Sequence, residues 1–334
     1  MTQPTAEPIL IPLDGSDMSE FAIPYAAAVA AALDAPALVT RIVERMRWTS
    51  TGAGYLIAPG EYAELMELAT QDARTQTQRV AEGLRARGVA ARPLVEEALS
   101  PAALIEIQRR ERVALVVMAT HARTGFARTA LGSVADQLVR EGSCPTLLLR
   151  ARGRLPEQPA LERALIPLDG SALSELALTE LERVAGRLVK RVTLARVIDA
   201  EARGGASREA AHALEATRQR VERDIAQLRG QVETLLLWGP PAQQILEESA
   251  RHDLILMATH GEGGAARWAF GSVASEVASD VWARKPNQSP KLDSDSAIHS
   301  LRNDLIARTP RKPTTPSVPE AASPDAPMFE PAGQ

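Results

Sequence analysis

Two short motifs, each present twice, carry residue types suited to binding a charged small molecule. The pentapeptide PLDGS begins at Pro12 and at Pro167, and the tripeptide GSV begins at Gly132 and at Gly271. Glycine lets a backbone approach a ligand closely, and serine donates hydrogen bonds from its amide and its hydroxyl. A Gly-Ser pair that opens a helix also offers free N–H groups and the positive end of the helix dipole, which suit phosphate. The motifs predict phosphate sites, although each is also compatible with a simple helix cap.

The aspartates of the pentapeptides, Asp14 and Asp169, have two open interpretations. Each carboxylate either binds a ligand at the mouth of a cleft or braces its own turn by a local hydrogen bond. His121 and His260 are predicted to brace loops, because no serine or cysteine is arranged beside them with a third orienting group. Cys144, beside a proline at a strand start, is predicted to be a core residue.

Other kinds of chemistry have little support in the sequence. There is no G-x-x-x-x-G-K-[ST] motif, and the folded part has almost no lysine, which argues against P-loop phosphoryl transfer. No dedicated metal site is predicted from the acidic and histidine residues Asp72, Glu82, His212 and His252, whose spacing is not that of metal ligands.

The elements that must position these motifs also repeat. The heptapeptide LVVMATH begins at Leu115, and the closely similar LILMATH begins at Leu254. The first copy is longer, with an insertion expected in the loop 48–60. We therefore expect a domain at 1–152 (unit one), a linker at 153–160, a second domain at 161–284 (unit two) and a disordered, proline-rich tail at 285–334.

Within each unit, short β-branched runs alternate with helical patterns, which predicts a parallel sheet covered on both faces. The expected strands of unit one are 8–13, 37–43, 91–96, 114–119 and 145–149, and its helices are 18–32, 61–87, 101–110 and 133–140. In unit two the expected strands are 164–168, 192–198, 233–237 and 254–258, and the helices are 173–188, 207–229, 241–249 and 272–281.

The fold class is thus α/β, with two tandem doubly wound, Rossmann-like domains and a five-stranded parallel sheet in each. Unit two is expected to lack its last strand, or to borrow one, because residues 285–289 are not apolar. A weak helix is conceivable at 297–307. The unpaired edge that results could recruit another chain.

Composition excludes several classes of protein. The 334 residues carry a formal charge of −4, so no positive electrostatic field that would attract nucleic acid is expected. Only 3% of the residues are aromatic, so no surface for stacking on the bases of single-stranded nucleic acid is expected either. A single cysteine suits a reducing cytoplasm and excludes a disulfide framework. No signal peptide or membrane span is predicted.

Both units resemble the universal stress protein domain, and the chain resembles a tandem member of the ATP-binding branch of that family. That branch has a G-x2-G-x9-G-[S/T] motif after its fourth strand. The spacing is kept in both units, from Ala119 to Gly132 and from Ala258 to Gly271, and alanine replaces the first glycine in each. Unit two keeps the second glycine as Gly261, whereas unit one has Ala122 there.

The resemblance implies that ATP, with Mg²⁺, binds at these motifs, and it implies contacts for each position that matches. The implied cofactor-binding residues are Pro12, Asp14, Ile42, Met118, Ala119, Ala122, Gly132, Ser133 and Val134 in unit one, and Pro167, Asp169, Val197, Met257, Ala258, Gly261, Gly271, Ser272 and Val273 in unit two.

The departures from the family motif favour unit two as the nucleotide site. The methyl group of Ala122 obstructs close approach of a phosphate in unit one. Unit two has Glu262 where unit one has Arg123, which is unfavourable beside phosphate unless Mg²⁺ intervenes. Arg128 and Arg267 are equivalent and could reach phosphate in either unit.

Three functions follow as hypotheses. The first is a cytoplasmic, ATP-binding regulatory protein of the stress response that changes conformation or assembly and has no fast turnover. The second is a scaffold that binds an unknown protein partner and whose two clefts have degenerated and no longer bind nucleotide. The third, an enzyme acting on adenylated substrates, lacks a positioned base or nucleophile. The resemblance also implies a homodimer through residues 145–149.

Overall fold

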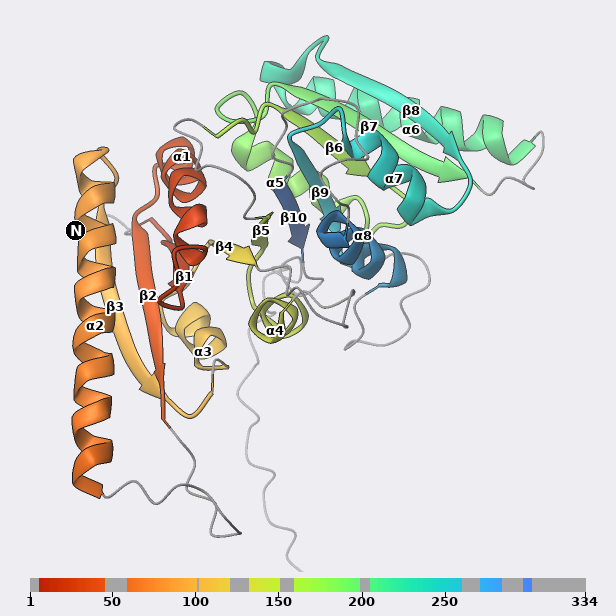
Figure 1. The fold of residues 1–334 in the computed structure, drawn as a ribbon. Helices are drawn as coiled ribbons and strands as arrows, with labels where there is room; N and C mark the ends of the chain where they lie inside the picture. Colours follow the sequence, from red (N-terminus) through yellow and green to blue (C-terminus); the bar gives the residue numbers. More distant parts are fainter. Residues whose placement is uncertain are drawn as a thin grey trace, which may run out of the picture.

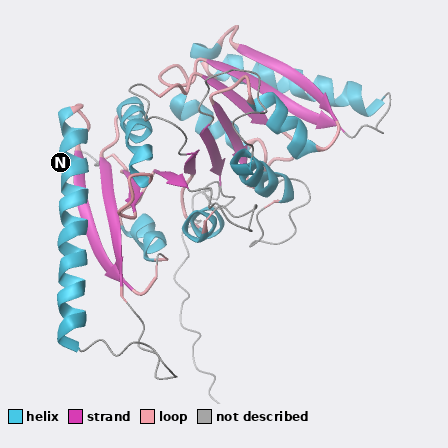
Figure 2. Ribbon diagram, in the orientation of Figure 1, coloured by secondary structure: helices cyan, strands magenta, loops and turns pink. Residues whose placement is uncertain are grey.

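The computed structural model describes residues 6–45, 59–100, 102–120, 132–150, 159–198, 205–259, 271–283 and 297–301. The described strands form one ten-stranded sheet in the order β3-β2-β1-β4-β5-β10-β9-β6-β7-β8. Figure 1 shows the two units at opposite ends of this sheet, and Figure 2 shows helices on both of its faces. The predicted fold class, two tandem doubly wound α/β units, is confirmed.

Unit one follows the predicted alternation of strands and helices. Its elements are β1 (Ile9–Leu13), the 3-10 helix η1 (Ser19–Ala22), α1 (Ile23–Leu33), β2 (Ala37–Glu44), α2 (Pro59–Ala86), β3 (Ala91–Ala98), α3 (Ala103–Arg110), β4 (Leu115–Thr120), α4 (Ser133–Glu141) and β5 (Thr146–Arg150). The strand order 3-2-1-4-5 reverses between β1 and β4, and all pairs within the unit are parallel.

Unit two repeats this plan. Its elements are β6 (Arg163–Pro167), α5 (Leu176–Val184), β7 (Arg191–Ile198), α6 (Gly205–Asp224), the 3-10 helix η2 (Ala226–Leu228), β8 (Val232–Trp238), α7 (Pro241–Ser249), β9 (Leu254–Ala258) and α8 (Ser272–Ala283). The order 8-7-6-9 reverses between β6 and β9, which is the counterpart of the reversal between β1 and β4.

The place of the fifth strand in unit two is filled from the tail. The short strand β10 (Ala297–Leu301) pairs in parallel with β9 and antiparallel with β5. The helix expected at 297–307 is therefore wrong for these five residues, whose backbone completes the ladder of β9 instead. The second unit contributes four consecutive strands of its own, as predicted, and the borrowed strand closes its edge. The remainder of the proposed tail and the linker residues 153–158 lie outside the described residues.

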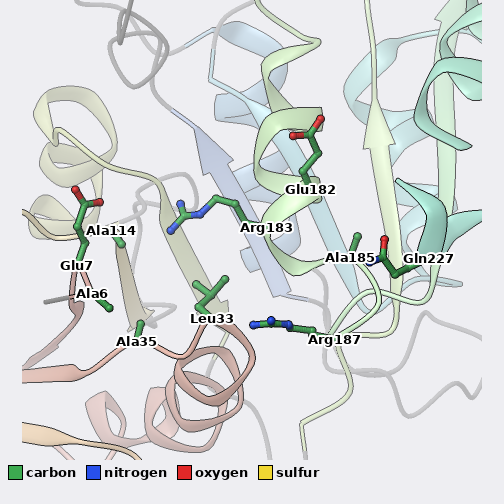
Figure 3. A pocket seen from close by; sticks show the side chains of 10 residues that line it. All are labelled: Ala6, Glu7, Leu33, Ala35, Ala114, Glu182, Arg183, Ala185, Arg187 and Gln227. Atoms are coloured by element: carbon green, nitrogen blue, oxygen red, sulfur yellow. The ribbon is translucent and has the colours of Figure 1, made fainter. Parts of the chain in front are cut away.

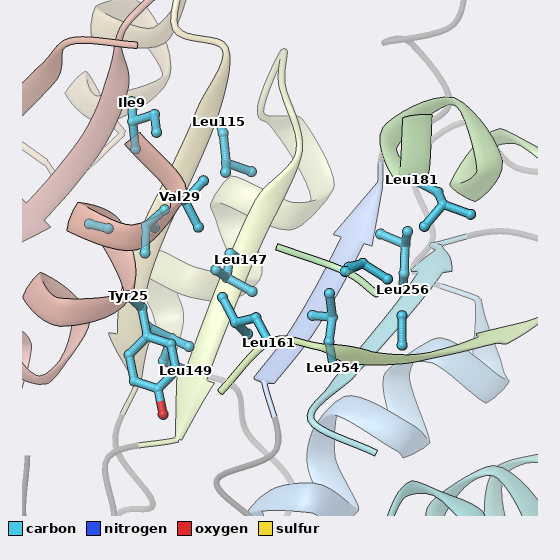
Figure 4. Packing of buried hydrophobic residues seen from close by; sticks show 14 of the residues in the cluster. Ile9, Tyr25, Val29, Leu115, Leu147, Leu149, Leu161, Leu181, Leu254 and Leu256 are labelled. Atoms are coloured by element: carbon cyan, nitrogen blue, oxygen red, sulfur yellow. The ribbon is translucent and has the colours of Figure 1, made fainter. Parts of the chain in front are cut away.

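The core is layered on the two faces of the sheet. β1 and β4 are buried along their whole length, as expected for central strands with helices on both sides. One buried cluster, beneath α1, α2, α5 and α6, contains residues of both units and runs without a break from Ile9 to Leu256 (Figure 4). A second cluster lies beneath the other α-helices that the structure describes, α3, α4, α7 and α8.

Contacts between the units extend beyond this shared core. α1 packs against α5, and the Arg187 guanidinium donates a hydrogen bond from Nη1 to the carbonyl oxygen of Ala32, 2.6 Å away. Ala32 lies in the last turn of α1, where the negative end of the helix dipole favours a cation. The interface is thus held by apolar packing and by a charge placed at a helix end.

Candidate functional site

The repeated motifs meet where the strand order reverses. Parallel α/β sheets bind ligands beyond the carboxyl ends of their strands at this reversal. β1 neighbours β4, and β6 neighbours β9, so each PLDGS turn is brought beside the end of the strand that precedes the Gly-Ser helix. The two predicted sites are therefore assembled by the fold, one in each unit.

The predicted residues within the strands line these ends. Pro12, Met118 and Ala119 are buried in unit one, and Met257 and Ala258 are buried in unit two, where Pro167 is half-buried. Ile42 and Val197, at the matching positions of β2 and β7, are half-buried and pack against the second hydrophobic cluster. Their positions agree with a role in shaping a cleft, and their contact with a ligand stays a prediction.

The two Asp-Gly-Ser turns have the same geometry. Asp14 Oδ1 accepts hydrogen bonds from the amide nitrogen of Ser16 at 2.9 Å and from its hydroxyl at 2.6 Å. Asp169 accepts the same two bonds from Ser171 at the same distances. The bracing role of both aspartates is thus present, and both side chains remain exposed at the carboxyl edge.

A second serine, three residues further on, extends each turn. In unit one the amide of Ser19 donates to Ser16 Oγ, and the Ser19 hydroxyl donates to the Ser16 carbonyl oxygen. Ser174 makes the equivalent bonds to Ser171. These two buried serines were not among the predicted residues, although the repeated spacing D-G-S-x-x-S is a signal that points to them.

An arginine lies against the glycine of each turn, and this was also missed. Gly15 and Gly170 have φ of +90° and +89°, a region that favours glycine. A Cβ on Gly15 would lie 2.6 Å from Arg41 Nη2, and one on Gly170 would lie 2.8 Å from Arg196 Nη1. Both arginines precede a predicted site residue, Ile42 or Val197, but only the pairing of β2 with β1 and of β7 with β6 shows that they meet these glycines.

The Gly-Ser motifs open helices as predicted. Gly132 is the N-cap of α4, with φ 85° and ψ 138°, and no side chain caps the helix. Ser133 and Ser272 are exposed at the first positions of α4 and α8, with Val134 and Val273 half-buried behind them. The amide of Gly271 donates to the carbonyl oxygen of Thr259, 2.8 Å away, which ties the start of α8 to the end of β9.

The loops between these landmarks cannot be compared with the prediction. Ala122, Gly261, Arg128, Arg267 and both loop histidines lie outside the described residues. Arg123 and Glu262 lie outside them as well.

Ion pairs surround the edge of unit one. Arg41 donates from Nη1 to Asp72 Oδ2 at 2.7 Å and to Gln76 Oε1 at 3.0 Å, both on α2. Near the end of β3, Arg45 contacts Glu97 at 2.7 Å and 2.9 Å, and this hydrogen-bonded guanidinium holds the pKa of the Glu97 carboxyl below its ordinary value. The cations on this side of unit one are therefore neutralised by the protein itself.

Three cavities in the described part of the chain lie away from the predicted residues. One of about 490 Å³ lies between the units, where Arg183 and Arg187 reach toward Glu7 and Leu33 (Figure 3). A second, of about 530 Å³, lies at the amino ends of β7 and β8, and a third lies between α2 and β3. None of the three includes a residue of the two motifs.

Metal and thiol chemistry have no structural support in the described ranges. These residues contain no group of three histidine, cysteine or acidic side chains able to hold a metal ion. Cys144 is buried, as predicted, and burial raises the pKa of its thiol to about 12, so the thiol stays protonated. Within the same residues, no helix combines the length and apolar character needed to cross a bilayer.

These features define a class of doubly wound α/β protein in which one unit with polar motifs at its carboxyl edge occurs twice. A model of the Universal stress protein family matches residues 5–150 and 161–283. Since these two matches cover most of the chain, the protein belongs to the universal stress protein family, and the predicted resemblance is confirmed.

Relatives with known sequences agree. The chain is 29% identical over 142 residues to a universal stress protein of Methanocaldococcus jannaschii, a match that covers 42% of this chain and 81% of the relative. It is 27% identical over 185 residues to one of Mycobacterium tuberculosis, covering 49% of this chain and 57% of that protein. The match therefore spans little more than half the length of the mycobacterial relative.

Solved structures support the two-unit fold. A universal stress protein of Archaeoglobus fulgidus has a TM-score of 0.62 at 17% identity, with 88% of this chain and 96% of that chain covered. A structure from Pseudomonas aeruginosa has a TM-score of 0.60 at 15% identity, with 90% and 95% covered. These likenesses concern the fold alone.

Proposed function

We propose that this protein is an ATP-binding regulatory protein of the stress response, and that nucleotide binding changes its conformation or assembly. The observation that carries the proposal is the assembly, at both reversals of strand order, of an Asp-Gly-Ser turn beside a helix that begins with Gly-Ser. Free N–H groups at such a helix start suit phosphate, and the location is where doubly wound sheets bind ligands.

The proposed ligand is ATP, accompanied by Mg²⁺ that the nucleotide itself carries. In unit two Ser272 and Gly271 would hold phosphate, and Asp169 and Val197 would contact the nucleoside. We place the stronger site in unit two, because it keeps Gly261. A cytoplasmic location is part of the proposal and follows from the lone cysteine.

The proposed role is regulation and not catalysis. Among the described residues at the carboxyl edge, the serine hydroxyls of both turns donate to aspartate or to backbone carbonyls. They are structural, and the part of the chain that the structure describes places no imidazole beside them to act as a general base. Any hydrolysis would be slow, and a regulatory effect requires that two states of the protein bind ATP with different affinity.

Calorimetric titration of the full chain with ATP and Mg²⁺ tests the proposal. We expect one strong site, weakened several-fold by Ser272→Ala, since a hydrogen bond to a charged group is lost. Ser133→Ala is the matched control, because Ser133 is equally exposed at the start of α4. If Ser272→Ala changes nothing while binding persists, the edge of unit two is not the site.

A second function, a scaffold for a protein partner, is favoured by one observation. The same carboxylate oxygen of Asp14, and of Asp169, already accepts two hydrogen bonds within its own turn. Both turns could therefore be purely structural. Absence of binding heat, together with absence of nucleotide in the purified protein, would establish this alternative over the nucleotide site.

A further inference from the structure

The two units differ most clearly in the surroundings of their duplicated arginine. Arg41 and Arg196 occupy the same strand position and pack against the same glycine turn. Arg41 is paired with Asp72 and hydrogen-bonded to Gln76. Among the residues that the structure describes, none forms an ion pair or hydrogen bond with the guanidinium of Arg196.

The helix that covers each arginine explains this difference. α2 lies over β2 and β3, and α6 lies over β7 and β8 in the same way. Matching their buried positions, Ala73 with Leu214 and Val80 with Val221, aligns Asp72 with Ala213 and Gln76 with Thr217. The Thr217 hydroxyl donates to the Ala213 carbonyl oxygen within its own helix. α6 therefore supplies neither the carboxylate nor the amide that holds Arg41.

The edge strand of unit two adds an aromatic ring to the same face. Register pairs Arg196 with Leu236 and Ile198 with Trp238, so Arg196 and Trp238 are diagonal neighbours on one face of the sheet. Trp238 ends β8 and is 53% exposed. In unit one the register pairs Arg41 with Val95 and Val43 with Glu97, so the place of Trp238 is taken by Glu97, which is paired with Arg45. A large exposed ring at the carboxyl edge suits stacking on a base.

The turn that contains Asp169 also connects to the face of the sheet that carries Arg196 and Trp238. After β6 the chain passes through the turn into α5, whose buried residues Ala177 and Leu181 belong to the first cluster. Leu194 and Leu236, the neighbours of Arg196 and Trp238 on their face, pack against that cluster as well. The turn, the guanidinium and the indole therefore border one side of the carboxyl edge, and the start of α8 borders the other.

From these placements we infer that Arg196 and Trp238 are the residues that make unit two selective for a nucleotide with an aromatic base and an anionic group. This inference rests on the proposed function and adds the residues that decide between the units. The guanidinium attracts the anionic part of the ligand, and the indole stacks on the base. Unit one offers an arginine paired with Asp72 and, in place of the ring, Glu97 paired with Arg45, so its edge discriminates poorly.

Binding of ATP to full-length variants tests this assignment. We expect Arg196→Gln to weaken binding about tenfold or more, and Arg196→Lys to restore part of the affinity, because a cation remains. Trp238→Leu, which removes the ring and keeps an apolar side chain, should weaken binding by at least roughly fivefold. Arg41→Gln and Glu97→Gln, at the equivalent positions of unit one, are the matched controls and should leave affinity unchanged. Circular dichroism and urea unfolding establish that each variant is folded.

Fluorescence gives a second readout. The chain has four tryptophans, and stacking should quench the emission of Trp238 when ATP is added. Quenching that disappears in Trp238→Leu supports the assignment. If the wild-type protein binds ATP, and Ser272→Ala weakens it while Arg196→Gln and Trp238→Leu do not, the inference is overturned and the proposed function stands. If the wild-type protein binds no ATP, both are overturned.

Discussion

The glycine of the Asp-Gly-Ser turn offers a quantitative test of how the arginine is packed. Gly15→Ala places a methyl group where the Arg41 guanidinium lies, 2.6 Å from Nη2, on a backbone with φ +90°. The left-handed backbone alone costs about 1–2 kcal/mol for alanine. Displacing the guanidinium also breaks its pair with Asp72, which is 69% exposed, so screening limits that loss to about 1 kcal/mol. We therefore expect Gly15→Ala to lower the free energy of unfolding by about 2–3 kcal/mol.

Gly170→Ala is the internal comparison. Its φ is the same and its Cβ would meet Arg196 at 2.8 Å, but no ion pair with a described residue is lost. We expect a loss of about 1–2 kcal/mol from the backbone alone. Urea unfolding of the full chain, followed by circular dichroism, measures both values.

A double-mutant cycle separates backbone strain from arginine packing. With Arg41→Ala in place, the methyl group of Gly15→Ala meets no guanidinium, and only the backbone cost remains. The two changes should therefore be coupled by about 1 kcal/mol. If Gly15→Ala is equally costly with and without Arg41, the packing argument is refuted.

Three further outcomes follow from the described contacts. Asp253→Ala should destabilise the protein by about 3 kcal/mol in urea unfolding, because the carboxylate is 5% exposed and accepts two side-chain bonds and one amide bond from Arg163; a loss below 1 kcal/mol would contradict a buried pair. Burial raises the pKa of Glu180 above its ordinary 4.5 despite Arg183, so its contribution to stability is full below that value and is lost as pH rises through the raised pKa. Glu180→Gln should therefore gain stability relative to wild type as the pH rises above 4.5, and a difference that does not change with pH would exclude the effect. Deleting residues 285–334 removes β10 and exposes β5 and β9, so sedimentation should detect a larger share of dimers than in the full chain, and an unchanged distribution of mass would show that these edges do not pair.

The fold was predictable because its signals are local and repeated. Buried strands such as β1 and β4 are continuous apolar runs, and the duplication supplied each boundary twice. A borrowed strand was one of two expected outcomes for unit two, but the segment that supplies it was not predictable, because Ala297–Leu301 lies in a polar, proline-rich region and forms a strand at the open edges of β5 and β9. The conformation of β10 is therefore set by its pairing with β5 and β9 and not by its own sequence.

The motif residues of the candidate site were predictable, whereas the side chains that pack against these motifs were not. Asp14, Ser133 and their counterparts follow from the repeated motifs alone. Arg41 and Arg196 required knowledge of which strand lies beside which turn, since the side chain reaches across from β2 or β7 to a glycine on the adjacent strand's loop. The different pairing of these arginines depends on α2 and α6, more than twenty residues away in the sequence of unit one.

Because one hydrophobic cluster contains residues of both units, the stability of each unit against unfolding depends on the other. Neither half can unfold without exposing apolar side chains of its neighbour, since Leu147 and Leu149 share the cluster with Leu254 and Leu256. A ligand held only by the native state lowers the unfolded population of the whole chain. Under the proposed function, occupancy of a single cleft would therefore protect the distant half from proteolysis as well.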